Sequence, residues 1–94
     1  MKTTAAEKLL NNSDLIVVDN YHLQSWNLDE EQSDESFIVL DFSYHDDEGY
    51  EYVYEFDGKA LKEAEIKGNV ITLNDIEGAI VEIQCFKLVP AKID

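Results

Sequence analysis

The chain has 94 residues, which is enough for one small domain and too few for two independent hydrophobic cores. Seven lysines, no arginine and 21 acidic residues give a net charge of −14, although 45% of the residues are hydrophobic. That apolar content excludes a disordered acidic tail, and the charge argues against direct binding to nucleic acid or to an anionic membrane surface.

The first expected element is a short helix over residues 5–10. Thr4 and Glu7 have the spacing of a capping box, in which each side chain bonds to the backbone N–H of the other residue. The polar residues 11–13 end this helix. Its two leucines would pack onto the sheet that follows.

A run of leucine, isoleucine and valine begins a strand that we expect over residues 15–22. We expect this strand to bend near the Asp-Asn pair at 19–20 and to continue to Trp26. The eight residues 29–36 hold no apolar side chain and predict an exposed loop.

Alternation of side chains predicts a long hairpin in the middle of the chain. Its first strand covers residues 36–44, with one face formed by Ile38, Leu40, Phe42 and Tyr44. Its return strand covers residues 50–56, with one face formed by Tyr50, Tyr52, Tyr54 and Phe56 and the other by Glu51, Val53, Glu55 and Asp57. Residues 45–49 form the connecting loop, where a glycine supplies a positive φ.

The sequence indicates the secondary structure from residue 57 onward less clearly. Asp57 and Gly58 have the sequence of a two-residue type I′ hairpin turn. Residues 59–67 fit a helix by composition and fit a strand paired with residues 70–73 equally well, so both alternatives stay open. A turn follows at 74–78, and a final long strand covers residues 79–89.

These elements predict an α+β fold in one small acidic domain over residues 1–94. A short N-terminal helix precedes a bent antiparallel sheet of about five strands. A second short helix at 59–67 is added if that segment is helical.

The negative charge is concentrated in one part of the sequence. Residues 9–58 contain fourteen of the 21 acidic residues and no lysine, whereas the rest of the chain holds all seven lysines and is neutral overall. Solubility alone does not require the exclusion of every lysine from such a stretch, and like-charge repulsion of this size costs stability. The asymmetry therefore favours an interaction surface over a plain solvated face.

No motif supports catalysis or metal binding. An EF-hand loop with Gly49 or Gly78 as its sixth residue would begin on Tyr44 or Leu73, neither of which ligates calcium. One cysteine and two histidines on separate elements do not make a zinc site, and Cys85 lies in an apolar alternating run typical of a buried thiol. A glycine-rich phosphate loop and a nucleophile elbow are both lacking. We therefore expect no enzymatic activity, no cofactor and no metal site, with weak cation binding at the acidic hairpin loop as a minor alternative.

The acidic side chains of two predicted loops and one strand form the candidate interaction surface. Acids two positions apart on a strand are separated by about 6.6 Å, so a rigid strand can present a line of charge as nucleic acid does. Trp26 borders the first acidic loop and is either an interface anchor or a residue that covers the core. The candidate partner-binding residues are Trp26, Asp29, Glu30, Glu31, Asp34, Glu35, Asp46, Asp47, Glu48, Glu51 and Glu55.

In charge and size the chain resembles small acidic inhibitors that occupy a nucleic-acid site on a target. These include phage-encoded nucleic-acid mimics, anti-CRISPR and anti-restriction proteins, and immunity proteins of nuclease toxins. The resemblance is one of physical type and transfers no functional residue.

The resemblance implies an inhibitor that occludes the basic surface of a nucleic-acid-handling protein, such as a nuclease or a defence complex. Its carboxylates would pair with the lysines and arginines that otherwise hold phosphates. An anti-defence protein of a phage or mobile element, such as an anti-CRISPR, is favoured. The alternatives are an immunity protein that neutralises a cationic nuclease toxin, and an acidic adaptor domain that forms a homodimer through a sheet edge. The chain shows no signal-peptide pattern and no apolar run longer than four residues, which predicts a cytoplasmic protein.

Overall fold

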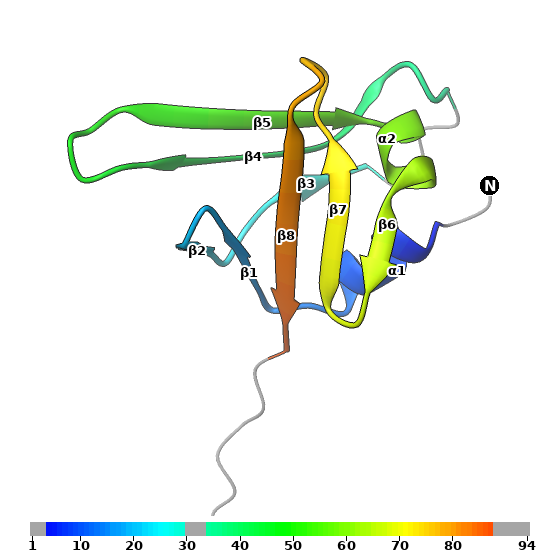
Figure 1. The fold of residues 1–94 in the computed structure, drawn as a ribbon, viewed down its shortest axis with the longest axis horizontal. Helices are drawn as coiled ribbons and strands as arrows, with labels where there is room; N and C mark the ends of the chain where they lie inside the picture. The colour runs from blue at the N-terminus through cyan, green and yellow to red at the C-terminus, as the bar shows by residue number, and fades with distance from the viewer. Residues whose placement is uncertain (1–3, 30–33, 88–94) are drawn as a thin grey trace, which may run out of the picture.

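A computed structural model describes residues 4–29 and 34–87 of the chain (Figure 1). Helix α1 (Ala5–Asn11) is followed by strands β1 (Leu15–Val18), β2 (Tyr21–Leu23), β3 (Asn27–Leu28), β4 (Ile38–His45) and β5 (Glu51–Asp57). Helix α2 (Gly58–Glu63) then leads into β6 (Glu65–Lys67), β7 (Val70–Asn74) and β8 (Ile80–Phe86). The strands pair antiparallel, which confirms the predicted α+β class with a five-stranded antiparallel sheet.

The five-stranded sheet has the order β2-β1-β8-β7-β6. Its strands show the predicted alternation of buried and exposed side chains, because one face of the sheet is buried and the other is exposed to solvent. In β8, for example, Val81, Ile83 and Cys85 are buried while Glu82 and Gln84 between them are exposed.

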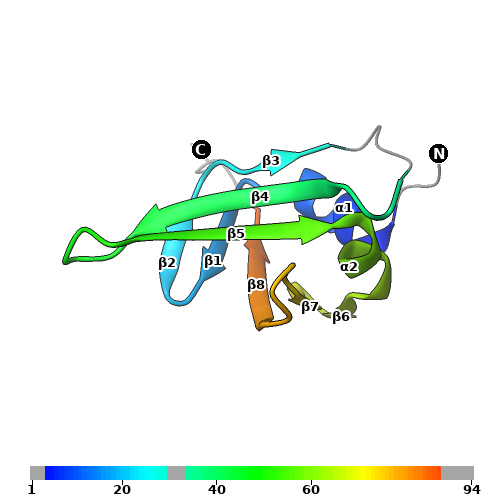
Figure 2. The same ribbon diagram turned by 90° about the horizontal axis from the view of Figure 1, so that it is seen from above.

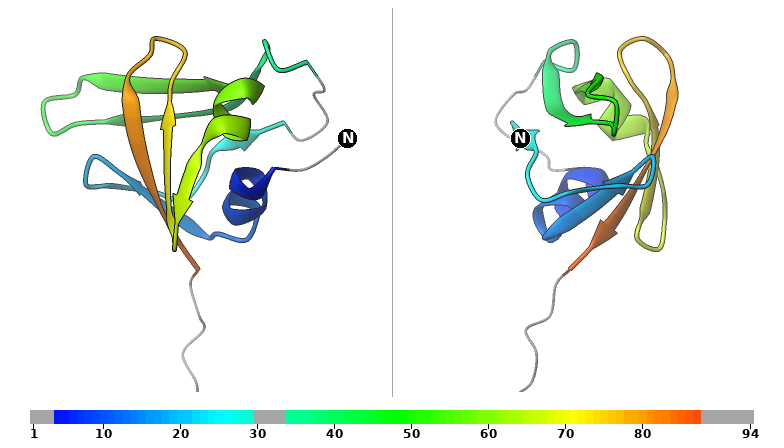
Figure 3. Two further views of the ribbon diagram at one scale, coloured as in Figure 1. Left: turned by 45° about the vertical axis from the view of Figure 1, so that its right-hand side comes forward. Right: turned by 90° about the vertical axis from the view of Figure 1, so that its left-hand side faces the viewer.

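A second sheet of order β3-β4-β5 covers the buried face of the first. Figure 1 shows β4 and β5 crossing β7 and β8 at a steep angle, and Figure 3 shows both helices gathered at one end of the two sheets. The core between the sheets includes Leu40, Phe42 and Phe56 from one side and Ile16, Ile71 and Ile83 from the other. The sequence predicted one bent sheet and did not indicate that the hairpin belongs to a separate sheet.

Helix α1 begins at the predicted capping box. The Glu7 N–H donates to Thr4 Oγ1 at 3.1 Å, and the Thr4 N–H donates to Glu7 Oε1 at 3.4 Å. Leu10 at its last turn is fully buried. Within the described ranges, neither helix has the length and apolar character needed to cross a membrane.

The predicted single strand over residues 15–22 is wrong. Asp19 and Asn20 both have positive φ, 52° and 70°, and form a tight turn that joins β1 to β2 as a hairpin with Val18 opposite Tyr21. Two consecutive residues with positive φ are the signature of a type I′ turn, and aspartate and asparagine tolerate this conformation better than other non-glycine residues.

The predicted hairpin turn at Asp57 and Gly58 is also wrong. Asp57 caps α2 instead, because its Oδ1 accepts a hydrogen bond from the Ala60 N–H at 2.8 Å. Gly58 is needed for a close approach, since a Cβ there would lie 3.0 Å from the Cα of Glu35. Residues 59–67, for which the sequence allowed either a helix or a strand, contain both. Helix α2 ends at Glu63, and β6 then pairs with β7.

An irregularity at the start of β4 changes one predicted face. The register shifts between Ile38 and Leu40, so Val39 and Leu40 are both buried while Ile38 is 36% exposed. Ile38 therefore does not share the buried face with Leu40 as alternation predicted. From Leu40 onward the predicted faces of β4 and β5 are correct.

Candidate interaction surface

Residues 41–55 form a two-stranded projection that we call the hairpin arm. Its pairing is regular from Asp41 opposite Glu55 to His45 opposite Glu51. In Figures 1 and 2 the tip of the arm extends beyond the rest of the described chain. The side chains near the tip are accordingly exposed, with Tyr50 at 63% and Val53 at 57%.

The loop at the tip is organised by Asp46. Its Oδ1 accepts hydrogen bonds from the N–H groups of Glu48 and Tyr50, both at 2.9 Å, and its Oδ2 accepts one from the Tyr52 hydroxyl at 3.1 Å. Desolvation works against the charged form, but these hydrogen bonds outweigh it and lower the pKa of Asp46. Asp46 therefore shapes the loop, and the neighbouring Asp47 and Glu48 are the exposed acids of the tip.

The outer face of the arm carries acids from both strands. Asp41, Ser43 and His45 of β4 lie opposite Glu55, Val53 and Glu51 of β5. Two carboxylates directly opposite each other are destabilising in a sheet, so the Asp41–Glu55 pair costs stability. Asn27 relieves part of that cost by donating from Nδ2 to Asp41 Oδ1 at 2.8 Å. Asp41 belongs with Glu51 and Glu55 on this face and was missing from the predicted site, although strand register could have indicated it.

The inner face of the arm is held by a tyrosine cluster around Asp19. Asp19 Oδ2 accepts hydrogen bonds from the hydroxyls of Tyr44 at 2.6 Å and Tyr54 at 2.5 Å. The rings of Tyr21 and Tyr44 stack with their centroids 4.4 Å apart. Burial, and then the bond to Asp19, raise the pKa of Tyr44, which keeps its hydroxyl protonated as a donor. This cluster ties the arm to the β1–β2 turn and was not predicted, because it joins residues far apart in the sequence.

The acids before β4 lie at the other end of the arm's strands. The backbone carbonyl of Glu35 accepts from the Lys59 N–H at 3.2 Å, and its side chain pairs with Lys62 of α2 at 3.0 Å. Asp34 accepts from the backbone N–H of Ser36 at 2.9 Å and from its hydroxyl at 2.7 Å; the backbone bond first and then the hydroxyl lower the pKa of Asp34. Seven residues of β5 span about 20 Å, so these acids do not continue the charge of the tip.

Two other parts of the predicted site have different outcomes. Glu30 and Glu31 lie outside the described residues. Asp29 is exposed at the end of β3, and its N–H donates to the Val39 carbonyl at 2.7 Å. The candidate partner-binding acids that the structure brings together are therefore those of the arm.

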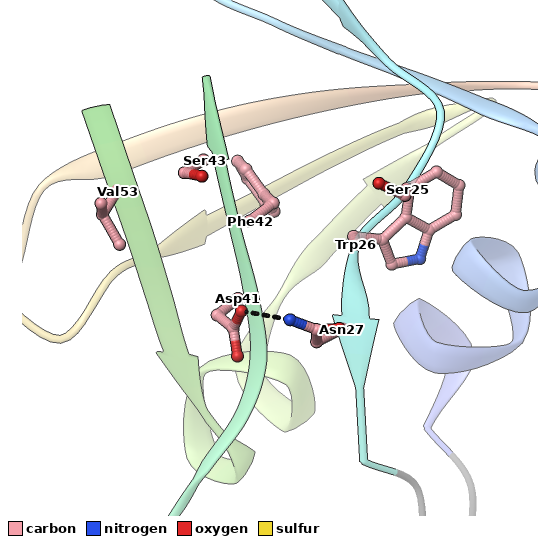
Figure 4. Close-up of a pocket in the computed structure, with 7 residues that line it drawn as sticks. All are labelled: Ser25, Trp26, Asn27, Asp41, Phe42, Ser43 and Val53. Carbon is pink, nitrogen blue, oxygen red and sulfur yellow. Dashed lines mark hydrogen bonds between the residues drawn. The ribbon is translucent and has the colours of Figure 1, made fainter. Parts of the chain in front are cut away.

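Trp26 packs against the core beside the arm. It is half-buried and lines a shallow pocket together with Asn27, Asp41, Phe42 and Ser43, and Figure 4 shows the Asn27–Asp41 bond across the gap between β3 and β4. Of the two alternatives for Trp26, this position fits a residue that covers the core better than an exposed interface anchor.

Groups that could carry other chemistry are sparse in the part of the chain that the structure describes. It contains no group of three or more histidine, cysteine or acidic side chains arranged to hold a metal ion. Cys85 is buried, as predicted, and desolvation raises the pKa of its thiol despite a hydrogen bond from Ser13.

The fold and surface define a small acidic α+β domain with a projecting, negatively charged hairpin arm. No family profile matches the sequence, and no curated protein matches it significantly.

Proposed function

We propose that this protein is a non-enzymatic inhibitor that binds the basic, nucleic-acid-binding surface of a target protein and occludes it as a nucleic-acid mimic. The favoured setting is the cytoplasm of a cell in which a phage or mobile element counters a defence system, as anti-CRISPR proteins do. The observation that carries the proposal is the outer face and tip of the hairpin arm, where Asp41, Glu51 and Glu55 lie on the paired strands and Asp47 and Glu48 lie in the loop that joins them.

The acids of the arm form a line of negative charge that is sparser than a phosphate backbone. Glu51 and Glu55 are four residues apart on β5, hence about 13 Å, and Asp41 stands across from Glu55 at roughly 5 Å. Double-stranded DNA carries one charge per about 3.4 Å of axis on each strand, so the acids of the arm match phosphates that are several positions apart. A target that holds phosphates with lysine and arginine would find carboxylates at comparable positions on the arm.

The distribution of lysines also supports the proposal. The described lysines lie outside the arm, at Lys8 of α1, Lys59 and Lys62 of α2, Lys67 of β6 and Lys87 after β8. Figure 1 places α1, α2 and β6 at the opposite end of the molecule from the arm's tip. The described lysines of α1, α2 and β6 therefore lie away from the tip and weaken its negative field little, which favours steered association with a basic partner.

Capture from a host lysate with added competitor tests the proposal. The protein is immobilised and exposed to lysate at low salt, and the bound proteins are then challenged with duplex DNA or with raised salt. We expect a bound nucleic-acid-handling protein that DNA displaces and that salt releases. A captured partner that stays bound to the immobilised protein in excess DNA would contradict nucleic-acid mimicry.

A further inference from the structure

One long edge of the arm has no neighbouring strand in the described part of the chain. β5 is the last strand of its sheet, and the Glu55 carbonyl accepts a hydrogen bond from the Ile76 N–H at 3.0 Å on the side away from β4. Backbone groups alternate in direction along a strand, so those of Glu51 and Val53 face the same open side. Ile76 covers this edge only at Glu55.

This edge differs from the two edges of the five-stranded sheet. There β2 and β6 are three residues long, and short edge strands offer little to pair with. β5 has seven residues, and at its open part Val53 is 57% and Tyr52 42% exposed. An extended chain that reached this edge would find free N–H and C=O groups together with apolar surface.

Charge decides which chain can pair there. If a second copy paired antiparallel about Val53, Glu51 of each copy would lie opposite Glu55 of the other, between two molecules that each carry −14. Like charges directly opposite are destabilising, so the edge disfavours the homodimer considered from the sequence. A strand with basic residues at the matching positions would neutralise the same carboxylates.

We propose that the free edge of β5 is the docking site for an extended basic segment of the partner, which adds to the three-stranded sheet as a fourth strand. The segment bonds to the N–H and C=O groups of Glu51 and Val53. It places an apolar residue opposite Val53 and a lysine or arginine opposite Glu51. This inference rests on the proposed function and specifies which part of the partner the arm binds.

The geometry of β5 also indicates which side chains suit the neighbouring positions of the added strand. Residues directly opposite on one face of an antiparallel pair lie about 5 Å apart, which lets a lysine or arginine reach the Glu51 carboxylate. A second basic residue two positions further on, toward the tip, approaches the exposed acids Asp47 and Glu48. The intervening residues of the segment face Tyr52 on the inner side.

A short synthetic peptide serves as the probe. It has the sequence Val-Thr-Lys-Thr-Lys with blocked ends, so that its valine lies opposite Val53, its first lysine opposite Glu51 and its second lysine nearer the tip. A second peptide of the same sequence carries N-methyl groups on the backbone nitrogens that would bond to β5. Binding is followed by NMR titration, and hydrogen exchange is measured at the amides of Glu51 and Val53.

We expect the first peptide to bind and to slow exchange at both amides at least tenfold. We expect N-methylation to weaken binding about fivefold or more, since one lost hydrogen bond is worth roughly that factor. Val53→Pro removes the outward N–H at a position where an edge strand tolerates proline, and it should weaken binding similarly. The control Val53→Thr keeps the N–H and should bind within about twofold of the wild type.

The proposal is overturned if the first peptide does not bind, if the N-methylated peptide binds equally well, or if the two amides exchange as fast as in the free protein. The N-methylated peptide keeps the test valid even if V53P fails to fold. Failure here is distinct from failure of the proposed function. Salt-sensitive peptide binding that N-methylation leaves unchanged would refute strand addition alone. Failure to capture any partner that DNA displaces would instead refute the proposed function.

Discussion

At the level of single residues, Asp19 holds the arm in place. It occupies the β1–β2 turn with a positive φ of 52°, and its carboxylate accepts from two tyrosine hydroxyls of the arm. Aspartate suits both tasks, because it tolerates the left-handed region and provides an anionic acceptor. This acid of the lysine-free stretch is therefore a structural group and not part of the interaction surface.

We expect Asp19→Ala to lower the free energy of unfolding by about 2 kcal/mol, because it removes two hydrogen bonds and forces alanine into the left-handed region. Urea denaturation measures this change. Asp19→Asn is the matched control, since asparagine removes the same charge but accepts the conformation and keeps an acceptor oxygen. It should cost less than about 1 kcal/mol. Equal losses for D19A and D19N would show that the turn and its bonds are not the reason.

At the level of elements, the cap of α2 fixes where β5 ends and the helix begins. Asp57 is the last residue of β5 and also accepts the Ala60 N–H, so strand and helix are joined without a loop. The N–H groups of Gly58 and Lys59 donate to the carbonyls of Phe37 and Glu35 at 3.3 and 3.2 Å. These bonds place the segment before β4 against the start of α2.

We expect Asp57→Ala to destabilise the protein by about 1 kcal/mol, the usual loss for a helix N-cap. Asp57→Ser removes the same charge but retains a capping oxygen, and it should stay within a few tenths of a kcal/mol of the wild type. Thermal unfolding of both variants under one set of conditions gives the comparison. If D57S is as unstable as D57A, the effect does not come from the cap.

The elements that could be predicted from the sequence are those whose pattern is local. The capping box of α1 and the alternation in β5 and β8 depend on residues within a few positions of one another, and all three elements are confirmed. Asp57-Gly58 suits both a hairpin turn and a helix N-terminus, and the contact with Glu35 that selects the helix lies over twenty positions away in the sequence. The split of the hairpin into a second sheet depends on β1 pairing with β8, which no local pattern indicates.

The same distinction applies to the candidate site. Alternation correctly placed Glu51 and Glu55 on the face opposite the tyrosines. Composition could not show that the Asp46 carboxylate accepts hydrogen bonds from the loop backbone or that Glu35 pairs with Lys62. Both contacts depend on the folded positions of the loop and of α2. Once these contacts within the chain are taken into account, the predicted interaction surface is reduced to the hairpin arm.

On the scale of the whole molecule, the charge of −14 is distributed unevenly in space as well as in sequence. The arm carries acids without lysine, while the helices at the other end carry Lys8, Lys59 and Lys62. Acids on the arm and acids elsewhere contribute equally to net charge but differently to the local field. Substitutions that remove the same number of charges from each place can therefore separate a located surface from general acidity.

The most direct measurement compares two such variants in the capture of a DNA-displaced partner. The arm variant carries D47N, E48Q, E51Q and E55Q, and leaves Asp46 intact because it organises the loop. The control variant carries E63Q, E65Q, E77Q and E82Q, which removes the same charge from exposed positions outside the arm. We predict that the arm variant weakens capture at least tenfold and the control by no more than about twofold. Equal capture by the two variants would contradict the claim that the hairpin arm is the surface that binds the partner.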